Sequence, residues 1–356
     1  MKGGEKGKKV AEKEVQWDLI DRLLLPLIFS HASAVIITVI LNTLRISQIS
    51  FFSVFLLIIF FTLLITLSYH NLKVSYAGKC IVLSGCENQI GYSIAKYLDD
   101  LGLTVYAGFY NNDKQKQKLK NECSGRLHAL DLDVSSEESI KAIFNYVQQQ
   151  PSGVWAVINA ANWGAFGESE WVPSSVLKKT INVNLFGTIS LSRTFLPLLR
   201  KTKGRVINIT SIAGRIRSGI RSPLCIVASG IQSFTDCLRL SMKRWGVDVI
   251  LIETGMLSTA SWYEKNDMIN EARTLWHSLT GDQRKDYDEK YFESKITSMY
   301  EYSNEQDDLT ILLKAVGDAV TRTFPMARYT PVTRKEKIQA FIAEHLPYSV
   351  YNIIYD

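Results

Sequence analysis

Two long uncharged stretches near the amino terminus constrain this chain more than any other feature of its sequence. Residues 23–44 and 49–69 contain no lysine, arginine, aspartate or glutamate, and only Arg45-Ile46-Ser47-Gln48 separates them. A helix needs about 20 mainly apolar residues to cross the hydrocarbon core of a bilayer, so each stretch is long enough to span a membrane. The short separation predicts two transmembrane helices that form a hairpin over residues 23–69.

The charges around these stretches predict their orientation. The tail at residues 1–22 is rich in lysine, whereas the intervening loop carries a single arginine. Because positive residues favour the cytosolic side, the tail is expected in the cytosol, and two crossings return the rest of the chain there. A cleaved signal peptide is the alternative, but the apolar run starts late and has double the usual length. We therefore expect a multi-pass protein of the endoplasmic reticulum membrane whose main domain faces the cytosol.

Composition restricts the class of the remaining chain. The hydrophobic content of 46% is high for a wholly soluble protein, and most of the excess lies before Lys73. The net charge is +6, but the basic residues are scattered and form no basic–aromatic stripe, so no nucleic-acid partner is expected. The cysteines are odd in number and include no CxxC pair, which predicts neither a disulfide framework nor a metal site.

From Gly78 onward, short β-branched runs alternate with amphipathic segments of helical length. This alternation predicts βαβ units and therefore a doubly wound parallel sheet of Rossmann type, an α/β fold, over residues 78–356. After Ser258 the chain becomes polar and rich in aromatic residues, which predicts a helical lid over about 257–308. The predicted strands are Cys80–Ser84, Thr104–Phe109, Leu127–Leu130, Trp155–Asn159, Arg205–Ile209 and Asp248–Ile252.

Short polar motifs follow these strands in a fixed order. The first strand runs into residues 84–91, a glycine-bearing turn that opens a helix, where backbone amides can hold a pyrophosphate. The later motifs are Leu132-Asp133-Val134-Ser135, Val157-Ile158-Asn159-Ala160-Ala161-Asn162, Val183-Asn184-Leu185-Phe186-Gly187 and Gly204-Arg205-Val206-Ile207-Asn208-Ile209-Thr210-Ser211. Together they resemble the short-chain dehydrogenase/reductase family over about residues 78–351. Within it, the chain is most similar to the membrane-bound branch of retinol dehydrogenases and 17β-hydroxysteroid dehydrogenase type 2.

The resemblance implies a catalytic set that this chain keeps only in part. In the family a serine polarises the substrate oxygen, an asparagine supports a water relay, and a tyrosine transfers the proton beside a lysine that lowers its pKa. Ser211 and Asn184 match the serine and the asparagine. Leu224 and Ala228 stand at the tyrosine and lysine positions, so the catalytic site is expected to be degenerate. The nearest substitutes for the lost acid are Tyr263, Arg217 and Arg221.

The implied cofactor is NAD or NADP, and its site is also altered. The residues that match the family's cofactor contacts are Gly85, Gly91, Asp133, Asn159 and Thr259. Gln89 replaces the middle glycine of the phosphate turn, where glycine lets the backbone approach the ligand. Asn162 replaces the glycine that follows the fourth strand, and the second strand ends at Phe109-Tyr110-Asn111 without an acid or an arginine. Impaired binding is therefore expected, with no preference between the two cofactors.

Several features keep two interpretations. Ser211 could polarise a carbonyl or cap a strand end, Asp133 could contact adenine or cap the following turn, and Asn184 could serve only to bend its helix. The aromatic lid could line a pocket for a sterol or retinoid, or it could simply pack against itself. Its aromatic residues are Trp262, Tyr263, Trp276, Tyr287, Tyr291 and Phe292.

Two functions follow from these observations. The first is a catalytically deficient family member that binds a hydrophobic lipid ligand or acts as a scaffold or regulatory partner, in a homo- or heterodimer with another family member. The alternative is an NAD(P)-dependent oxidoreductase that acts on a steroid or retinoid-like lipid through an altered proton relay.

Overall fold

A computed structural model describes most of the chain, which forms two compact units. The units divide between Lys73 and Val74. The described residues are 17–46, 48–75, 77–151, 153–164, 166–255, 265–304 and 309–355. The lysine-rich segment 1–16 and the lid residues Thr259, Trp262 and Tyr263 lie outside them.

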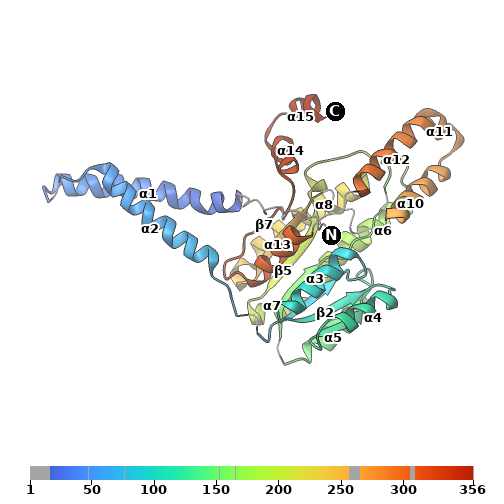
Figure 1. The fold of residues 1–356 in the computed structure, drawn as a ribbon, viewed down its shortest axis with the longest axis horizontal. Helices are drawn as coiled ribbons and strands as arrows, with labels where there is room; N and C mark the ends of the chain where they lie inside the picture. Colours follow the sequence, from blue (N-terminus) through green and yellow to red (C-terminus); the bar gives the residue numbers. More distant parts are fainter. Residues whose placement is uncertain are drawn as a thin grey trace, which may run out of the picture. The chain divides into compact units, whose positions relative to one another are not determined.

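The first unit contains two long apolar helices, α1 (Trp17–Thr43) and α2 (Phe51–Asn71) (Figure 1). Both are long and apolar enough to cross a membrane. The hydroxyls of Ser30 and Thr62 form a hydrogen bond of 3.0 Å between them, and the edge of the His31 ring meets the ring of Phe55. The two predicted apolar segments therefore form a helical hairpin, and α1 begins six residues before the predicted span.

The second unit contains a seven-stranded parallel sheet in the order β3-β2-β1-β4-β5-β6-β7. The strands are β1 (Cys80–Ser84), β2 (Thr104–Phe109), β3 (Leu127–Asp131), β4 (Val154–Asn159), β5 (Arg205–Ser211), β6 (Asp248–Thr254) and β7 (Arg328–Tyr329). The predicted doubly wound fold is confirmed. From β1 the chain adds β2 and β3 on one side, and from β4 onward it adds strands on the other side of β1. In such a sheet, ligands bind outside the carboxyl ends of the strands at this switch point.

Helices cover both faces of this sheet (Figure 1). Because successive residues of a strand point to opposite faces, Ile81 and Leu83 pack into one core and Cys80 and Val82 into the other. The first core is closed by α3 (Gln89–Asp100), α4 (Asp113–Glu122) and α13 (Thr310–Thr321). The second is closed by α5 (Glu137–Gln148), α7 (Gly187–Thr202) and α8 (Ser222–Met242).

The lid segment forms three helices around an aromatic core. They are α10 (Lys265–Ser278), α11 (Gly281–Tyr287) and α12 (Glu289–Asn304), and α14 (Arg334–His345) and α15 (Tyr348–Tyr355) end the chain. The rings of Trp276 and Phe292 stack 4.6 Å apart, and Trp171 meets both edge-on. All three side chains are buried. In its described part, the aromatic lid therefore packs against itself, and this favours the second of the two interpretations above.

Two tyrosines attach the lid to the loop before α6 (Ser174–Thr180). The Tyr287 hydroxyl donates to the Glu170 carboxylate at 2.8 Å, and the Tyr291 hydroxyl donates to Glu168 at 2.5 Å. The bond to Glu170 raises the pKa of Tyr287 to about 12. The contact between the lid and Glu170 therefore favours the neutral phenol of Tyr287.

We expect this attachment to weaken in strongly alkaline solution. The pKa of an exposed tyrosine is near 10, so the folded pKa is the higher one. Its contribution to stability is complete below about pH 10 and is lost as the pH rises through about 12. The difference in tyrosinate absorbance between the wild type and Tyr287→Phe should titrate near the upper value. A difference that titrates near pH 10 would contradict the bond to Glu170.

Candidate active site

The candidate site lies at the carboxyl edge of the sheet, where β5 ends beside the start of α8. Ser211 is the last residue of β5 and pairs with Thr254 of β6. Its hydroxyl accepts a hydrogen bond of 3.2 Å from the Ala213 backbone N–H and so caps the short 3-10 helix η2 (Ile212–Gly214). The hydroxyl therefore has a structural role here, and it also lines the cavity described below.

Asn184 holds the loop after β4 in place. It lies in a π-helical turn, η1 (Ile181–Phe186), which joins α6 to α7. Its amide nitrogen donates to the side-chain oxygen of Asn162 at 2.5 Å and to the Trp163 carbonyl at 2.8 Å, and its oxygen accepts from the Trp163 N–H at 2.8 Å. All of these bonds stay within the protein, as expected for a residue that shapes its surroundings.

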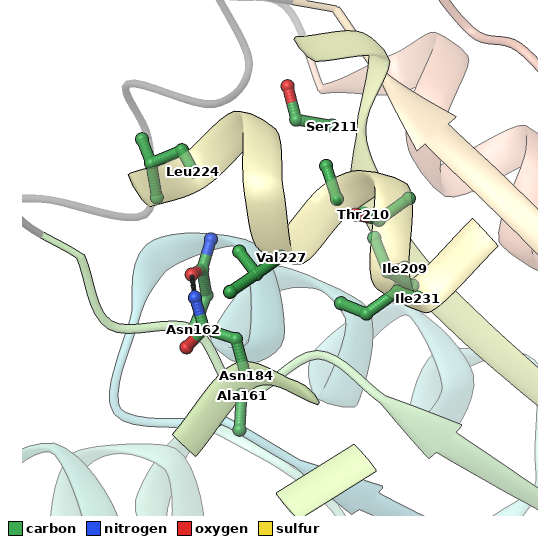
Figure 2. Close-up of a pocket in the computed structure, with 10 residues that line it drawn as sticks. Ala161, Asn162, Asn184, Ile209, Thr210, Ser211, Leu224, Val227 and Ile231 are labelled. Carbon is green, nitrogen blue, oxygen red and sulfur yellow. Dashed lines mark hydrogen bonds between the residues drawn. The ribbon is translucent and has the colours of Figure 1, made fainter. Parts of the chain in front are cut away.

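Leu224 and Ala228 face the same small cavity from the first two turns of α8. Figure 2 shows Leu224 above the hydrogen-bonded pair Asn162 and Asn184, with Val227 beside the pair. Leu224 is 3% exposed and Ala228 2% exposed. The cavity volume is about 20 Å³, room for roughly one water molecule. Its lining residues are Ala161, Asn162, Asn184, Ile209, Thr210, Ser211, Leu224, Val227, Ala228 and Ile231.

The four positions derived from the family motif therefore meet in one place, but none of the four side chains is ionisable near neutral pH. None of the described side chains that line the cavity is an acid, an amine or a phenol. Leu224 also belongs to the buried cluster of the lid, which includes Phe166, Trp171, Trp276 and Phe292. The side chain at the tyrosine position is thus part of an apolar core.

Of the candidate substitutes for the missing acid, the two that the structure describes are not among the residues that line this cavity. Arg217 is exposed and Arg221 is half-buried, and Tyr263 lies outside the described residues. The neighbouring thiol of Cys225 is buried, and burial raises its pKa. A thiol with a raised pKa is neither a nucleophile nor a strong acid at neutral pH.

The phosphate turn keeps its frame. Gly85 has a φ of +80°, and a methyl group there would overlap the backbone of Ala160; one at Gly91 would overlap the Gly85 carbonyl. The Asn88 side chain caps α3 by accepting from the Gly91 N–H at 2.8 Å, and it donates to the Ala160 carbonyl at 3.2 Å. The two glycines are thus required by packing alone. Gln89, the first residue of α3, is exposed and does not disturb the turn.

The other predicted cofactor contacts also have partners within the protein. The Asp133 carboxylate accepts from the N–H and the hydroxyl of Ser135 at 2.8 and 2.6 Å and so caps the following turn. The buried Asn159 amide donates to Ser192 at 2.9 Å and to Asn208 at 2.7 Å, which joins β4, β5 and α7. Thr259 lies outside the described residues.

An acid near the second strand was missed by the motif comparison. The Glu87 carboxylate, from the phosphate turn, accepts a hydrogen bond of 3.2 Å from the Tyr110 N–H just after β2. Burial raises its pKa, while the backbone donors oppose this effect. The residues at the end of the second strand give no sign of this carboxylate, because Glu87 comes from the phosphate turn.

Some of these residues could bind a dinucleotide and others could not. The turn and helix that would receive the phosphates are intact, and Glu87 provides an acceptor beside β2. At the other end, Asn162 adds a side chain in place of glycine, and Ala228 has no amine to hold a ribose. We therefore derive no hydride-transfer step through this site.

A parallel sheet in this order, with a glycine turn between β1 and α3, defines a protein of the dinucleotide-binding α/β class. The family model described as short chain dehydrogenase matches residues 79–270. The mouse (Mus musculus) mitochondrial D-beta-hydroxybutyrate dehydrogenase is 35% identical over 288 residues, which are 78% of this chain and 84% of that protein. The chain belongs to the short-chain dehydrogenase family.

Two further mouse relatives match the branch expected from the motifs. Estradiol 17-beta-dehydrogenase 2 is 30% identical, and the match covers 78% of this chain and 74% of the relative. Retinol dehydrogenase 7 is 32% identical, and the match covers 71% of this chain and 80% of the relative. A solved short-chain dehydrogenase from Streptomyces avermitilis has a TM-score of 0.62 at 20% identity and covers 79% of this chain and 96% of that chain. It supports the fold alone.

Proposed function

We propose that this chain is a catalytically deficient short-chain dehydrogenase that acts as a regulatory or scaffold partner at a membrane. The observation that carries the proposal is the placement of Leu224 and Ala228, which meet Ser211 and Asn184 in one cavity whose described lining contains no ionisable group. A positioned acid or base typically contributes 10²–10⁴-fold to the rate. Leu224 provides no such acid or base, and Ala228 provides no amine to hold the ribose. Without these two groups, the chain lacks the means for the dehydrogenase reaction that the family name implies.

The apolar lid supports the same proposal. The cavity bounded by the described residues has a volume of about 20 Å³, far smaller than the roughly 300–1,000 Å³ of a small-molecule pocket. To enter this cavity, a hydrophobic lipid ligand would have to displace Leu224 or other lining residues. Among the roles proposed from the sequence, a protein partner, as a homo- or heterodimer, is therefore favoured over a lipid ligand.

The proposed location is the endoplasmic reticulum membrane, with the hairpin α1–α2 as the anchor and the sheet unit in the cytosol. Support comes from the length and apolar character of both helices and from the lysine-rich tail. Protease accessibility of the sheet unit in sealed microsomes tests the orientation. Protection of that unit would overturn it.

The alternative function is an NAD-dependent oxidoreductase for a steroid or retinoid-like lipid. The retained phosphate turn and the dehydrogenase names of the relatives favour it. The Glu87 carboxylate would repel a 2′-phosphate, so this alternative implies NAD rather than NADP.

Cofactor binding separates the two functions. We expect the purified full chain to show no NADH or NADPH binding by fluorescence. At 1 mM ligand, a dissociation constant above about 1 mM stabilises by less than about 0.4 kcal/mol, so the shift in Tm should stay below roughly 2 °C. Micromolar NADH binding with oxidation of a sterol or retinol would refute the deficiency, and a preference for NADH over NADPH would support the role of Glu87.

A further inference from the structure

A group of basic side chains surrounds one exposed tryptophan on the second unit, away from the candidate active site. The chain passes through two turns there: the end of α7 before β5, and the 3-10 helix η3 (Lys243–Trp245) before β6. Trp245 is 42% exposed. We call this group the Trp245 patch, and its members are Arg200, Lys201, Lys203, Lys243, Arg244 and Trp245.

Direct contacts join these two turns. The guanidinium of Arg200 lies 5.0 Å from the centre of the Trp245 ring, and that of Arg244 lies 5.3 Å from it. A methyl group on Gly246 would come within 3.6 Å of the Lys203 side chain, so Lys203 borders the same turn. Both guanidinium groups therefore lie within cation–π distance of the exposed indole.

The positive charge of the patch is not neutralised by the described part of the chain. No ion pair within the described residues engages any of its five cations. The nearby carboxylate of Asp248 pairs with the buried Arg205. Basic residues are common on protein surfaces because water solvates their charges. Solvation does not explain why the exposed Trp245 indole lies among them.

The position of the patch indicates what it could bind. Lys203 and Trp245 each lie just before a strand, at the amino edge of the parallel sheet, and β1 also begins at this edge. Residues 72–79 link α2 to β1, and a fully extended chain of that length covers at most roughly 28 Å. A bilayer crossed by α2 would thus be within reach of this edge.

We propose that the Trp245 patch binds the anionic phospholipid headgroups of the membrane that anchors the hairpin. Arginine forks match phosphate oxygens, lysines near a membrane are attracted to anionic lipids, and tryptophan favours the headgroup level. The proposal rests on the membrane anchoring proposed above. It assigns this edge of the sheet a function separate from the candidate active site.

Lysine labelling in nanodiscs tests this assignment. The full chain is incorporated into discs of phosphatidylcholine alone or with about 30% phosphatidylserine, and acylation of individual lysines is followed by mass spectrometry. We expect labelling of Lys201, Lys203 and Lys243 to slow roughly five-fold in the anionic discs and to recover in high salt, because salt screens exposed charges. Lys114 and Lys120, exposed on α4, serve as internal controls and should not change.

A variant separates binding by the patch from a general effect of charge. Arg200→Gln with Arg244→Gln removes both guanidinium groups and keeps all reporter lysines, so protection should fall below roughly two-fold. Equal labelling of the patch lysines in the two kinds of disc would overturn the proposal, because protection would then not depend on phosphatidylserine and would indicate a protein surface. Protection of Lys114 equal to that of the patch lysines would also overturn it. Failure of the chain to enter discs would refute the anchor and the patch together, whereas entry without protection refutes the patch alone.

Discussion

Replacing Leu224 by tyrosine and Ala228 by lysine in the full chain is expected to lower its stability without producing NADH binding. Leu224 is part of the packed lid cluster, and overpacking a core typically costs 1–3 kcal/mol. Ala228 is buried, and no described acid lines the cavity to pair with a new ammonium group. We expect Tm to fall by roughly 5–15 °C.

Two companion variants make this result interpretable. Leu224→Met conserves the volume and should cost less than about 1.5 kcal/mol, which controls for the mere change of side chain. Adding Asn162→Gly to the double variant removes a side chain from the cavity, and we expect NADH binding to require this change as well. The expectation fails if the double variant alone keeps its Tm and binds NADH at micromolar concentration, because the site would then be only two residues from competence.

The strands of the sheet could be predicted because buried parallel strands are short, nearly continuous apolar runs. Each predicted strand overlaps an observed one, and Cys80–Ser84 matches β1 at both ends. β7 could not be predicted as a strand, since two residues, Arg328 and Tyr329, show no periodicity. Pairing with Leu251 and Ile252 of β6 creates this strand, and such a contact is set by the tertiary fold.

The resemblance to the family placed Ser211 and Leu224 near each other, and in the structure both line one cavity. The burial of Leu224 among lid residues was not predictable, since Trp171 and Trp276 reach it from distant segments. Nor could spacing place Glu87 against Tyr110, because the phosphate turn has to fold before the two meet.

Arg205→Ala is expected to be among the most destabilising single changes in the second unit. The Arg205 side chain is 1% exposed, and its guanidinium donates to the carbonyls of Ala319, at 2.5 Å, and Arg322 at the end of α13. It lies 3.6 Å from the Asp248 carboxylate and over the Trp155 ring. Removing the guanidinium leaves these two buried carbonyls without their donor, and each unsatisfied buried group typically costs about 1–3 kcal/mol. Arg205→Lys should lose part of this amount, because lysine lacks the planar fork.

Arg239 provides a matched control for this prediction. It also donates to two backbone carbonyls, of Val249 and Ala327, and pairs with a carboxylate, but its side chain is 29% exposed. We therefore expect Arg239→Ala to cost only about 1–2 kcal/mol, as measured by Tm or urea unfolding of the full chain. Equal losses for the two variants would show that burial is not what makes Arg205 important. The end of α13 that Arg205 contacts also holds the start of the sheet unit, because the Thr321 carbonyl accepts a hydrogen bond of 2.7 Å from the Val74 N–H.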